Sequence, residues 1–410
     1  MRIPEYTTGR DGGSLDLGCD GRHSHLSTVR AVIVSHLYAS PASRGKLHAL
    51  VGQGAAVAVA VPARWTPPGS AEPLETPFAE DNGVRIVPIP TTGREANGAP
   101  AAWRTGALRR LLTDFRPDIV QVEEEPTTRV AAGVTRLARQ LGIPALAFST
   151  DSLQHPYPLL PRMRRRRTLS RATGIVGANA VVTGLVRTEF PALAAESIPQ
   201  LGLPVPRALA VEPHAPLAIG FVGRLVPEKG LDVLLRACVR LYGAWTLTVA
   251  GTGPEQETLE ALAERLGIAS RVTWLGGISR AQLATLWPRL DCLVAPSRTT
   301  AGWVETYPVQ VLEAMGHGVT VVVSDSGALP EVVGKAGLTF RDGHPEGLTE
   351  ALTRLLEDGE FRERLAADGR RRVIAEYVDD AIARKTLTFW RAVRERAAER
   401  WPGGDLSRRP

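Results

Sequence analysis

The chain has 410 residues, of which 44% are hydrophobic and 22% charged, an ordinary balance for a globular protein. This length is enough for two or three domains, each with its own core. The longest apolar stretch, at 55–61, is far too short to cross a bilayer. Residues 1–28 lack the apolar segment of a signal peptide, so we expect them to form a flexible leader.

The net charge of +6 comes almost entirely from arginine, since the chain has only four lysines. Part of the excess lies in the run PRMRRRR at 161–167. This run is either a solvated helix face or, through Arg164–Arg167, a peripheral contact with an anionic membrane surface or a phosphorylated acceptor. We expect no nucleic-acid partner, because no aromatic residues are interleaved with the basic ones and no nucleic-acid-binding motif is present.

The three cysteines, Cys19, Cys238 and Cys292, are isolated and form no CxxC pair. They are too few for a disulfide framework, so we expect reduced thiols in a cytoplasmic protein, with Cys238 and Cys292 in the core. His23 and His25 have no matching cluster of carboxylates, so the sequence predicts no metal site.

In the first half of the chain, short β-rich stretches alternate with helical patterns, as in parallel sheets with crossover helices. Strands are predicted at 29–35, 55–61, 84–89, 118–122 and 144–149, with one or two more within 174–184. Helices are predicted at 44–53, 101–115 and 127–141. The Pro- and Gly-rich stretches 62–80 and 90–100 are predicted to be surface loops.

The segment 201–217 holds four prolines and is predicted to be a linker, with 206–216 as the boundary between domains. A second α/β series follows, with strands predicted at 217–223, 246–251, 271–276, 291–296, 319–324 and 337–340 and a helical tail from 345. The fold class is therefore α/β, with two Rossmann-like, doubly wound domains, 29–205 and 217–379. Ligands in such sheets bind at the carboxyl ends of the strands, so we expect the site in a cleft between the domains.

Two cations follow the first strand of the second domain, in FVGRLVPEKG. Gly223 permits a sharp turn and a close approach of a ligand to the backbone. Arg224 and Lys229 lie in the loop that leads into the next helix. Two cations five residues apart suit a diphosphate leaving group, because they can stabilise the charge that develops as its bond breaks. The alternative is that both cations are exposed and pair with Glu228 and Asp232.

Two glutamates, Glu305 and Glu313, flank the start of a predicted helix at 307–315. Pro308 suits the first turn of this helix, and Val309, Leu312 and Met315 are predicted to form its buried stripe. Glu305 lies just before the helix and Glu313 on its second turn. The helix N-terminus offers free amides and a positive dipole end to an anion.

A GxG sequence at Gly251 and Gly253 follows a predicted strand and suggests a dinucleotide site. The third glycine of that motif is absent, because position 256 is Gln, and no acidic residue ends the next strand. We therefore expect no NAD and no other cofactor.

The two glutamates, with Arg224 and Lys229 upstream, resemble the motif of the retaining glycosyltransferases of family 4, which have the GT-B fold. The resemblance is strong over 217–340 and looser over 29–205. It implies that the first domain holds a hydroxyl acceptor, the second a nucleotide-diphosphate sugar, and that the last helix, at about 380–400, packs back on the first domain. It also implies that Glu305 contacts the transferred sugar and Glu313 the ribose, without a metal.

The resemblance assigns further residues to the donor: Gly251 near the nucleotide, the backbone from Gly276 to Ile278 at the base, and the chain around Tyr307. Family members have glycine where this chain has Pro308, which offers no amide, so Val309 or Gln310 takes over that contact.

In the first half, the loop with Ser43, Arg44 and Gly45 matches one that opens onto the donor phosphates and the acceptor. Residues 124–126 and 151–161 follow strand ends and so face the cleft. Within the second of these, His155 is a candidate for touching the sugar or acceptor.

Two alternatives remain open at this stage. The first is a sugar-nucleotide epimerase with the GT-B fold, which needs acid–base residues but no acceptor cleft. The second is a non-catalytic scaffold with the same fold, which the intact set of four charges disfavours. The sequence leaves the sugar, the base and the acceptor open; natural products, glycolipids and polysaccharide precursors are candidates for the last.

Overall fold

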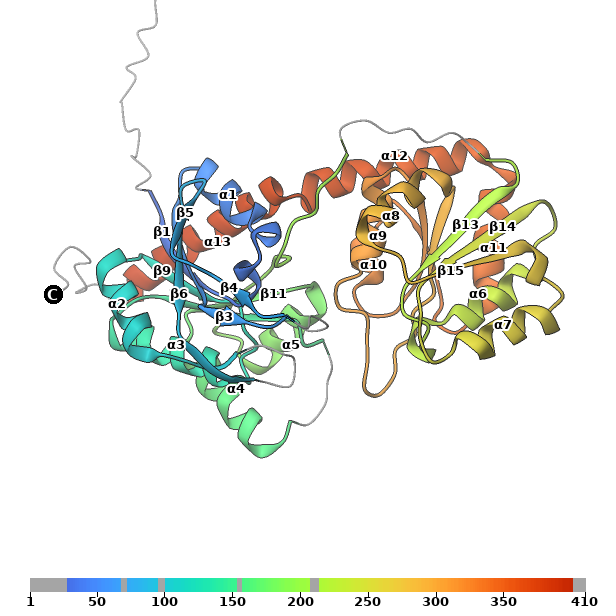
Figure 1. Cartoon of the computed structure of the whole chain (residues 1–410). Helices are drawn as coiled ribbons and strands as arrows, with labels where there is room; N and C mark the ends of the chain where they lie inside the picture. The colour runs from blue at the N-terminus through green and yellow to red at the C-terminus, as the bar shows by residue number, and fades with distance from the viewer. Residues whose placement is uncertain (1–27, 68–71, 95–99, 153–156, 207–213, 401–410) are drawn as a thin grey trace, which may run out of the picture.

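The computed structural model describes residues 28–67, 72–94, 100–152, 157–206 and 214–400, and these form two α/β lobes (Figure 1). The predicted leader, apart from Thr28, lies outside the described residues, as do Cys19, the two histidines near it and the middle of the predicted linker. No helix in the described ranges combines the length and apolar character needed to cross a membrane.

Among the described residues, an eight-stranded sheet forms the first lobe, in the order β12-β11-β10-β9-β1-β2-β6-β5. All its pairings are parallel except that of β5 with β6. Its strands are β1 (Arg30–Val34), β2 (Ala56–Pro62), β5 (Ala79–Asp81), β6 (Val84–Ile89), β9 (Ile119–Val122), β10 (Ala145–Ser149), β11 (Gly174–Gly177) and β12 (Ala194–Ser197). Its helices are α1 (Gly45–Gly52), α2 (Thr105–Phe115), α3 (Arg129–Gln140), α4 (Leu159–Arg171), α5 (Ala180–Glu189) and α13 (Asp379–Arg400).

Both faces of this sheet are buried, which explains why its central strands are apolar throughout. Successive residues of a strand point to opposite faces. In β2, Val57 and Val59 accordingly pack with α1 and α13, whereas Ala58 and Ala60 pack with α2 and α3.

The sequence-based strands of the first half are confirmed, but the intervening segments contain more structure than predicted. Within 62–80 and 90–100, predicted as loops, the chain forms two antiparallel hairpins. These are β3 (Arg64–Trp65) with β4 (Leu74–Glu75), and β7 (Thr91–Arg94) with β8 (Pro100–Trp103). Strand β8 also shortens the helix predicted from 101, and the second half of 174–184 begins α5 instead of a strand. Strands of two to four residues are too short for their alternation of apolar and polar residues to be recognised in the sequence.

The second lobe contains a six-stranded, fully parallel sheet in the order β15-β14-β13-β16-β17-β18 within the described chain. All six predicted strands are confirmed: β13 (Leu217–Val222), β14 (Trp245–Ala250), β15 (Val272–Gly276), β16 (Cys292–Ala295), β17 (Thr320–Ser324) and β18 (Leu338–Phe340). The helices are α6 (Leu231–Cys238), α7 (Gln256–Arg265), α8 (Arg280–Leu286), α9 (Val309–Gly316), α10 (Leu329–Val333), α11 (Pro345–Glu357) and α12 (Gly359–Glu376).

Helices also cover both faces of the second sheet, with α6, α7 and α11 on one side and α9, α10 and α12 on the other. Cys238 and Cys292 are fully buried in the first of these layers, as predicted. Burial raises the pKa of the Cys238 thiol to about 12 and that of Cys292 well above its ordinary value. Both thiols are therefore protonated core residues and not nucleophiles.

The chain leaves the second lobe along α12 and returns to the first lobe as α13, drawn in red in Figure 1. Helix α13 packs against α1, and its fully buried Trp390 lies in the core of the first lobe. At the turn between the two helices, Asp379 accepts a hydrogen bond from the amide of Gly202, and burial raises the pKa of its carboxyl. The segment from α12 to α13 thus joins the two lobes, and α13 is anchored in the core of the first lobe.

A buried polar network holds this returning helix. The indole of Trp390 donates to Gln121 Oε1 at 2.7 Å, and Gln121 Nε2 donates to Glu123 Oε1 at 2.7 Å. The ammonium of Lys46 in α1 lies 2.6 Å from the same Glu123 oxygen. Gln200 Nε2 donates to the second Glu123 oxygen at 3.3 Å. The charge of Glu123 is therefore fully compensated inside the protein.

We expect Lys46→Ala to lower the free energy of unfolding by about 3–5 kcal/mol, because it leaves Glu123 as an unpaired buried carboxylate. Urea denaturation followed by circular dichroism measures the change. The control is Lys335→Ala, which truncates an exposed lysine and should change stability by less than about 0.5 kcal/mol. Equal midpoints for the two variants would show that the buried pair is not needed.

Candidate active site

The three glycines predicted near the donor, Gly223, Gly251 and Gly276, meet at the carboxyl ends of β13, β14 and β15. The amide of Gly251 donates to Gly276 O at 2.8 Å. Gly251 has a φ of +150°, and a side chain there would overlap the carbonyl of Gly223. No larger residue fits at position 251, so backbone alone forms this part of the sheet edge.

Lys229 and Glu305, 76 residues apart in sequence, form an ion pair with 2.5 Å between Nζ and Oε2. Both side chains are largely buried, and the ammonium also lies 4.8 Å from the centre of the Trp303 ring. Ser297 Oγ donates to the same Glu305 oxygen at 3.1 Å. A buried cation and carboxylate held this closely form a charge-assisted hydrogen bond that fixes both side chains. The fixed pair can bind an anionic ligand or sugar hydroxyls.

Arg224, in contrast, is loosely held. Its side chain is 66% exposed and lies 3.7 Å from Glu228. An exposed pair of this length contributes little free energy, so the guanidinium is free to swing toward a ligand. The alternative pairing considered for Lys229 does not occur, because Asp232 is bound by Arg298 at 2.7 Å.

The predicted helix after Glu305 begins two residues later than expected, at Val309. Pro308 has φ −80° and ψ 76°, and the Val309 amide donates to Tyr307 O at 2.9 Å. This is an inverse γ-turn. The Val309 amide, assigned from sequence to a donor contact, is therefore already engaged. In the helix, Val309 is half-buried and Val311 takes its expected place in the core beside Leu312 and Met315.

Glu313 lies on α9, as predicted, and is bound by Arg280 of α8 at 2.8 Å between guanidinium and carboxylate. Arg280 is itself highly exposed, while the Glu313 side chain is mostly buried. The arginine is the exposed partner of the pair, so a ligand hydroxyl that reaches the carboxylate has only a solvent-exposed side chain to displace.

In the first lobe, polar side chains gather at the carboxyl ends of β1, β9 and β10. His36 donates its backbone amide to Glu124 Oε1 at 3.1 Å, and its ring Nδ1 lies 2.6 Å from the same oxygen. Glu125 accepts from Thr150 N and from Thr150 Oγ1, both at 2.6 Å, and from Ser149 Oγ at 2.8 Å. Burial raises the pKa of the Glu125 carboxyl, and these hydrogen bonds oppose the rise.

Arg44 and Gly45 do not join this cluster. The Arg44 guanidinium is buried, where it donates to Tyr38 O and Ala39 O and pairs with Asp81 at 2.8 Å. That pairing lowers the pKa of the Asp81 carboxyl. A side chain at position 45 would overlap the carboxylate of Asp379. Both residues thus hold the first lobe and its returning helix, and the Arg44 guanidinium is fully engaged there. His155 lies outside the described residues.

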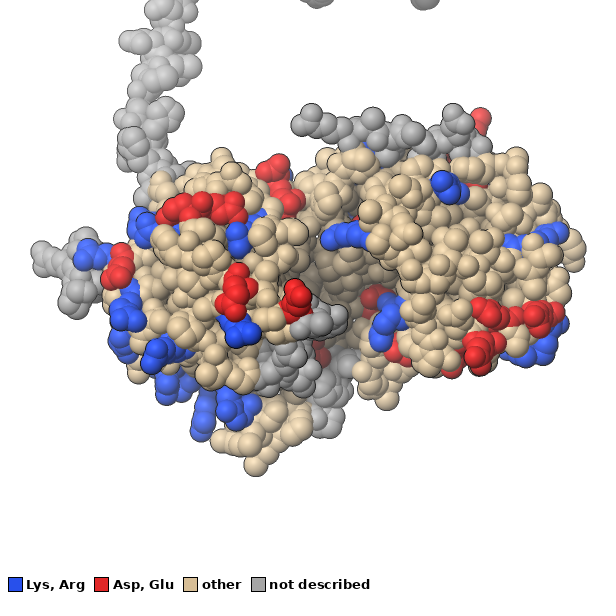
Figure 2. All heavy atoms as spheres, in the orientation of Figure 1, with Lys and Arg blue, Asp and Glu red and all other residues tan. Residues whose placement is uncertain are grey.

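The two lobes touch beside this region, and the surface is hollowed between them in Figure 2. Asn179, at the start of α5, donates through Nδ2 to Thr306 O at 2.8 Å, while its Oδ1 accepts from Val182 N at 3.0 Å. Tyr307 O–H donates to Leu201 O at 2.9 Å. The loop that carries Glu305 is therefore fixed by the first lobe as well as the second.

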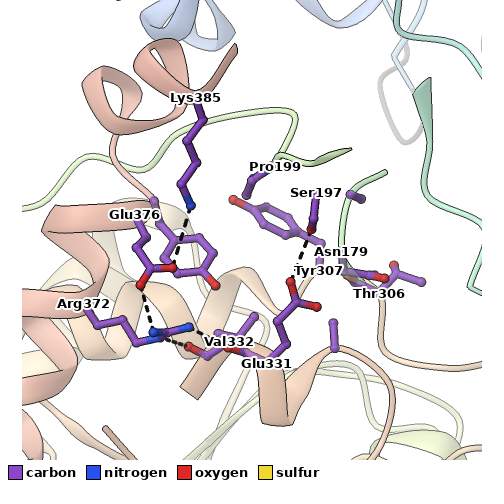
Figure 3. A pocket seen from close by; sticks show the side chains of 13 residues that line it. Asn179, Ser197, Pro199, Thr306, Tyr307, Glu331, Val332, Arg372, Glu376 and Lys385 are labelled. Atoms are coloured by element: carbon purple, nitrogen blue, oxygen red, sulfur yellow. Dashed lines mark hydrogen bonds and ion pairs between the residues drawn. The ribbon is translucent and has the colours of Figure 1, made fainter. Parts of the chain in front are cut away.

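A second set of contacts encloses a small polar cavity of about 80 Å³ between the lobes (Figure 3). Glu331 of α10 accepts from Ala180 N at 2.7 Å and from Ser197 Oγ at 3.3 Å. Its carboxylate thus neutralises the positive N-terminal end of α5. Across the cavity, Arg372 and Lys385 both point toward Glu376 (Figure 3).

The carboxyl edges of both sheets therefore face each other, with a cation–carboxylate pair on one side and a His–carboxylate pair on the other. Within the described ranges, no three His, Cys, Asp or Glu side chains converge as metal ligands. Sequence reasoning missed His36, Ser297 and Trp303. His36 offered the one readable signal, since it follows a predicted strand end.

Two family models match the chain. Residues 209–372 match "Glycosyl transferases group 1", and residues 39–195 match "Glycosyl transferase 4-like domain". A GDP-mannose-dependent α-(1-6)-phosphatidylinositol monomannoside mannosyltransferase of Mycobacterium tuberculosis is 30% identical over 334 residues, which is 75% of this chain and 84% of that protein. An uncharacterised glycosyltransferase of Methanocaldococcus jannaschii is 31% identical over 43% of this chain and 45% of its own length.

Solved structures show the same fold at low sequence identity. Sucrose-phosphate synthase of Thermosynechococcus elongatus has a TM-score of 0.62 at 18% identity, over 89% of this chain and 99% of that one. HepE of Anabaena in complex with UDP has a TM-score of 0.62 at 16% identity, over 89% and 100%. The predicted GT-B fold is confirmed by these neighbours and by the two parallel sheets.

We expect Asn179→Asp to loosen the two lobes, because it keeps the cap on α5 but replaces the donor to Thr306 O with a carboxylate oxygen. Small-angle X-ray scattering should show a larger radius of gyration, with little change in the melting temperature. Gln140→Glu makes the same exchange at an exposed position of α3 and serves as control. A scattering curve identical to that of the wild type would show that this contact does not set the lobe arrangement.

Proposed function

The chain belongs to the group 1 glycosyltransferases of the family 4 type, and from this premise we propose the reaction that it catalyses. It transfers a sugar from a nucleotide-diphosphate sugar to an acceptor hydroxyl, retains the anomeric configuration and needs no metal. The observation that carries the proposal is the buried Lys229–Glu305 pair at the edge of the second sheet, whose lysine shares the loop after β13 with the loosely held Arg224.

The donor diphosphate binds between Arg224 and Lys229, against the backbone of Gly223 and Gly251. The absence of side chains at these glycines lets the diphosphate approach the backbone at the sheet edge closely. Two cations supply the positive charge that a metal ion supplies in other enzymes. Arg224 is exposed and only weakly paired, so its closure onto the diphosphate accompanies donor binding.

Glu305 and Glu313 divide the remaining parts of the donor. Glu305, held by Lys229 and Ser297, accepts hydrogen bonds from hydroxyls of the transferred sugar. Glu313 accepts those of the ribose after Arg280 moves away. The carboxylate of Glu305 is prealigned by two partners, which suits a group that must hold the sugar as its bond to phosphate stretches.

In the transfer step, the bond between the anomeric carbon and the phosphate oxygen breaks, and the nucleoside diphosphate leaves with the electron pair. The acceptor oxygen forms its bond to the anomeric carbon on the same face. Its proton passes to the leaving phosphate, so no side chain has to act as base. Arg224 and Lys229 stabilise the charge that develops on the diphosphate.

The acceptor lies against the first lobe, where His36, Glu124 and Glu125 line the carboxyl edge of the sheet. These groups suit hydrogen bonding to hydroxyls, as found in natural products, glycolipids and polysaccharide precursors. The mycobacterial relative is named for GDP-mannose, and HepE is seen with UDP, so guanosine and uridine donors are the first candidates.

Two experiments in sequence test the reaction. Thermal-shift screening against UDP, GDP, ADP and TDP sugars identifies the donor, since a ligand at 100 times its dissociation constant adds ~2.7 kcal/mol. The donor is then incubated with acceptors in excess chelator, and the anomeric coupling of the product is read by NMR. We expect full activity and the donor's own anomeric configuration.

Each part of the proposal has its own contrary result. Activity that chelator abolishes and magnesium restores contradicts metal independence, and an inverted product contradicts retention. Conversion of the sugar nucleotide into its epimer in the absence of an acceptor identifies an epimerase. Binding of no sugar nucleotide at all identifies a scaffold.

Substitutions of the two glutamates are expected to affect different properties of the enzyme. Glu313→Gln should weaken binding of the free nucleoside diphosphate by about tenfold, because the ribose belongs to donor and product alike. Glu305→Gln should leave that binding nearly unchanged and lower turnover by about 100-fold, because its contact strengthens in the transition state. Calorimetry and steady-state kinetics measure the two effects. Weaker nucleotide binding in Glu305→Gln than in Glu313→Gln would reverse the assignment.

A further inference from the structure

Helix α4 begins with large apolar side chains in water. Leu159 is 71% exposed, Leu160 63% and Met163 39%. Exposed apolar side chains are ordinary when scattered, but here three fall within five residues. These three side chains therefore form a small exposed apolar patch, the apolar tip of α4, on the first lobe.

The same helix is strongly basic, with six arginines and no acidic residue between Leu159 and Arg171. Arg165 is committed elsewhere, since it pairs with Glu189 and lies over the rings of Tyr157 and Phe190. Arg162, Arg166 and Arg167 are exposed, and within the described part of the chain none of them forms an ion pair. Of the four arginines predicted to form a surface at Arg164–Arg167, the first two are half-buried and the last two are exposed.

Helical geometry places the exposed residues on one face. Leu159, Arg162, Met163, Arg166 and Arg167 follow the spacing i, i+3, i+4, i+7 and i+8. The face is apolar in its first turn and cationic in its last. On the face drawn in Figure 2, Lys and Arg side chains gather over the part of the first lobe where Figure 1 places α4.

The opposite face of α4 is anchored to the protein. Thr168 and Leu169 are buried, and Thr168 Oγ1 donates to Pro126 O at 2.9 Å. The helix packs beside α3, so its exposed face is presented by a rigid support. Because α4 connects parallel strands β10 and β11, its first turn lies at the carboxyl edge of the sheet, the edge that faces the other lobe.

We propose that this face, the docking face (Leu159, Leu160, Arg162, Met163, Arg166 and Arg167), binds the surface of an anionic lipid bilayer. Leucine and methionine side chains enter the boundary between headgroups and acyl chains, and the arginines reach lipid phosphates. A nucleic acid would satisfy the arginines but would leave the apolar tip in water. The combination of both chemistries on one helix face therefore favours a membrane.

Docking by α4 has a consequence for the acceptor, which rests on the proposed glycosyl transfer. The apolar tip is at the cleft-facing edge of the first sheet, so a docked enzyme presents its acceptor wall next to the bilayer. The acceptor class that this arrangement serves is a lipid-borne hydroxyl. Binding to lipid is measured without any turnover, so a failure of this inference is distinct from a failure of the proposed reaction.

The test is sedimentation of the full-length protein with vesicles of phosphatidylcholine alone and with 30% phosphatidylglycerol. We expect strong binding only to the anionic vesicles, weakened by added salt. Arg162→Gln with Arg166→Gln and Arg167→Gln should lower the partition coefficient by about fivefold for each arginine, or about 100-fold in total. Leu159→Ser with Leu160→Ser should lower it by about tenfold or more at constant charge.

Matched controls lie in the second lobe. Arg265→Gln with Arg289→Gln and Arg341→Gln removes the same charge from exposed positions, and Val239→Ser with Tyr242→Ser removes exposed apolar surface. Both should bind vesicles nearly as the wild type does.

The proposal is overturned if the wild type does not prefer anionic vesicles, or if the controls lose as much binding as the docking-face variants. It is also overturned if those variants lose binding to a single-stranded RNA while binding to vesicles is unchanged.

Discussion

The arrangement of the site depends on the return of the chain from the second lobe to the first. Helix α13 could not hold this position by apolar packing alone, because Trp390 brings an indole N–H into the core. Gln121, Glu123 and Lys46 satisfy that donor and one another in a closed network. A network of this kind is stable only when all of its members are present, so it fixes one packing of α13. The relative position of the two carboxyl edges follows from it.

The turn that precedes α13 adds a steric constraint. Asp379 lies between Gly45 and Gly202, and at either position a side chain would overlap it. Glycine in this loop was interpreted from sequence as an opening toward phosphates. In the structure it lets a helix from the far end of the chain approach, and the buried Arg44 beside it ties the loop to Asp81. The same residue type thus serves packing here and ligand access at Gly251.

Sequence alone predicted the two doubly wound sheets, because apolar strands with helical patterns between them leave few other folds. It also placed Glu305 and Glu313 at the start of a helix. It could not predict the Lys229–Glu305 contact, which depends on how two loops from different strands meet across the sheet edge. Nor could it separate Arg44 from Arg224, since both are arginines in loops after a strand. Only their burial distinguishes them. Arg44 is buried and donates its hydrogen bonds to backbone carbonyls, whereas Arg224 is exposed.

Pro308 reduces the number of backbone amides that the start of α9 can offer to a ligand. Proline has no amide to offer, and the γ-turn that it forms also consumes the amide of Val309. The N-terminus of α9 therefore presents fewer free donors to an anion than a helix that starts with an ordinary residue. An anionic ligand bound at this edge must draw more of its stabilisation from side-chain cations. Lys229 is fixed by Glu305 and Arg224 is not, so the structure leaves Arg224 as the group that can adjust its position to the ligand.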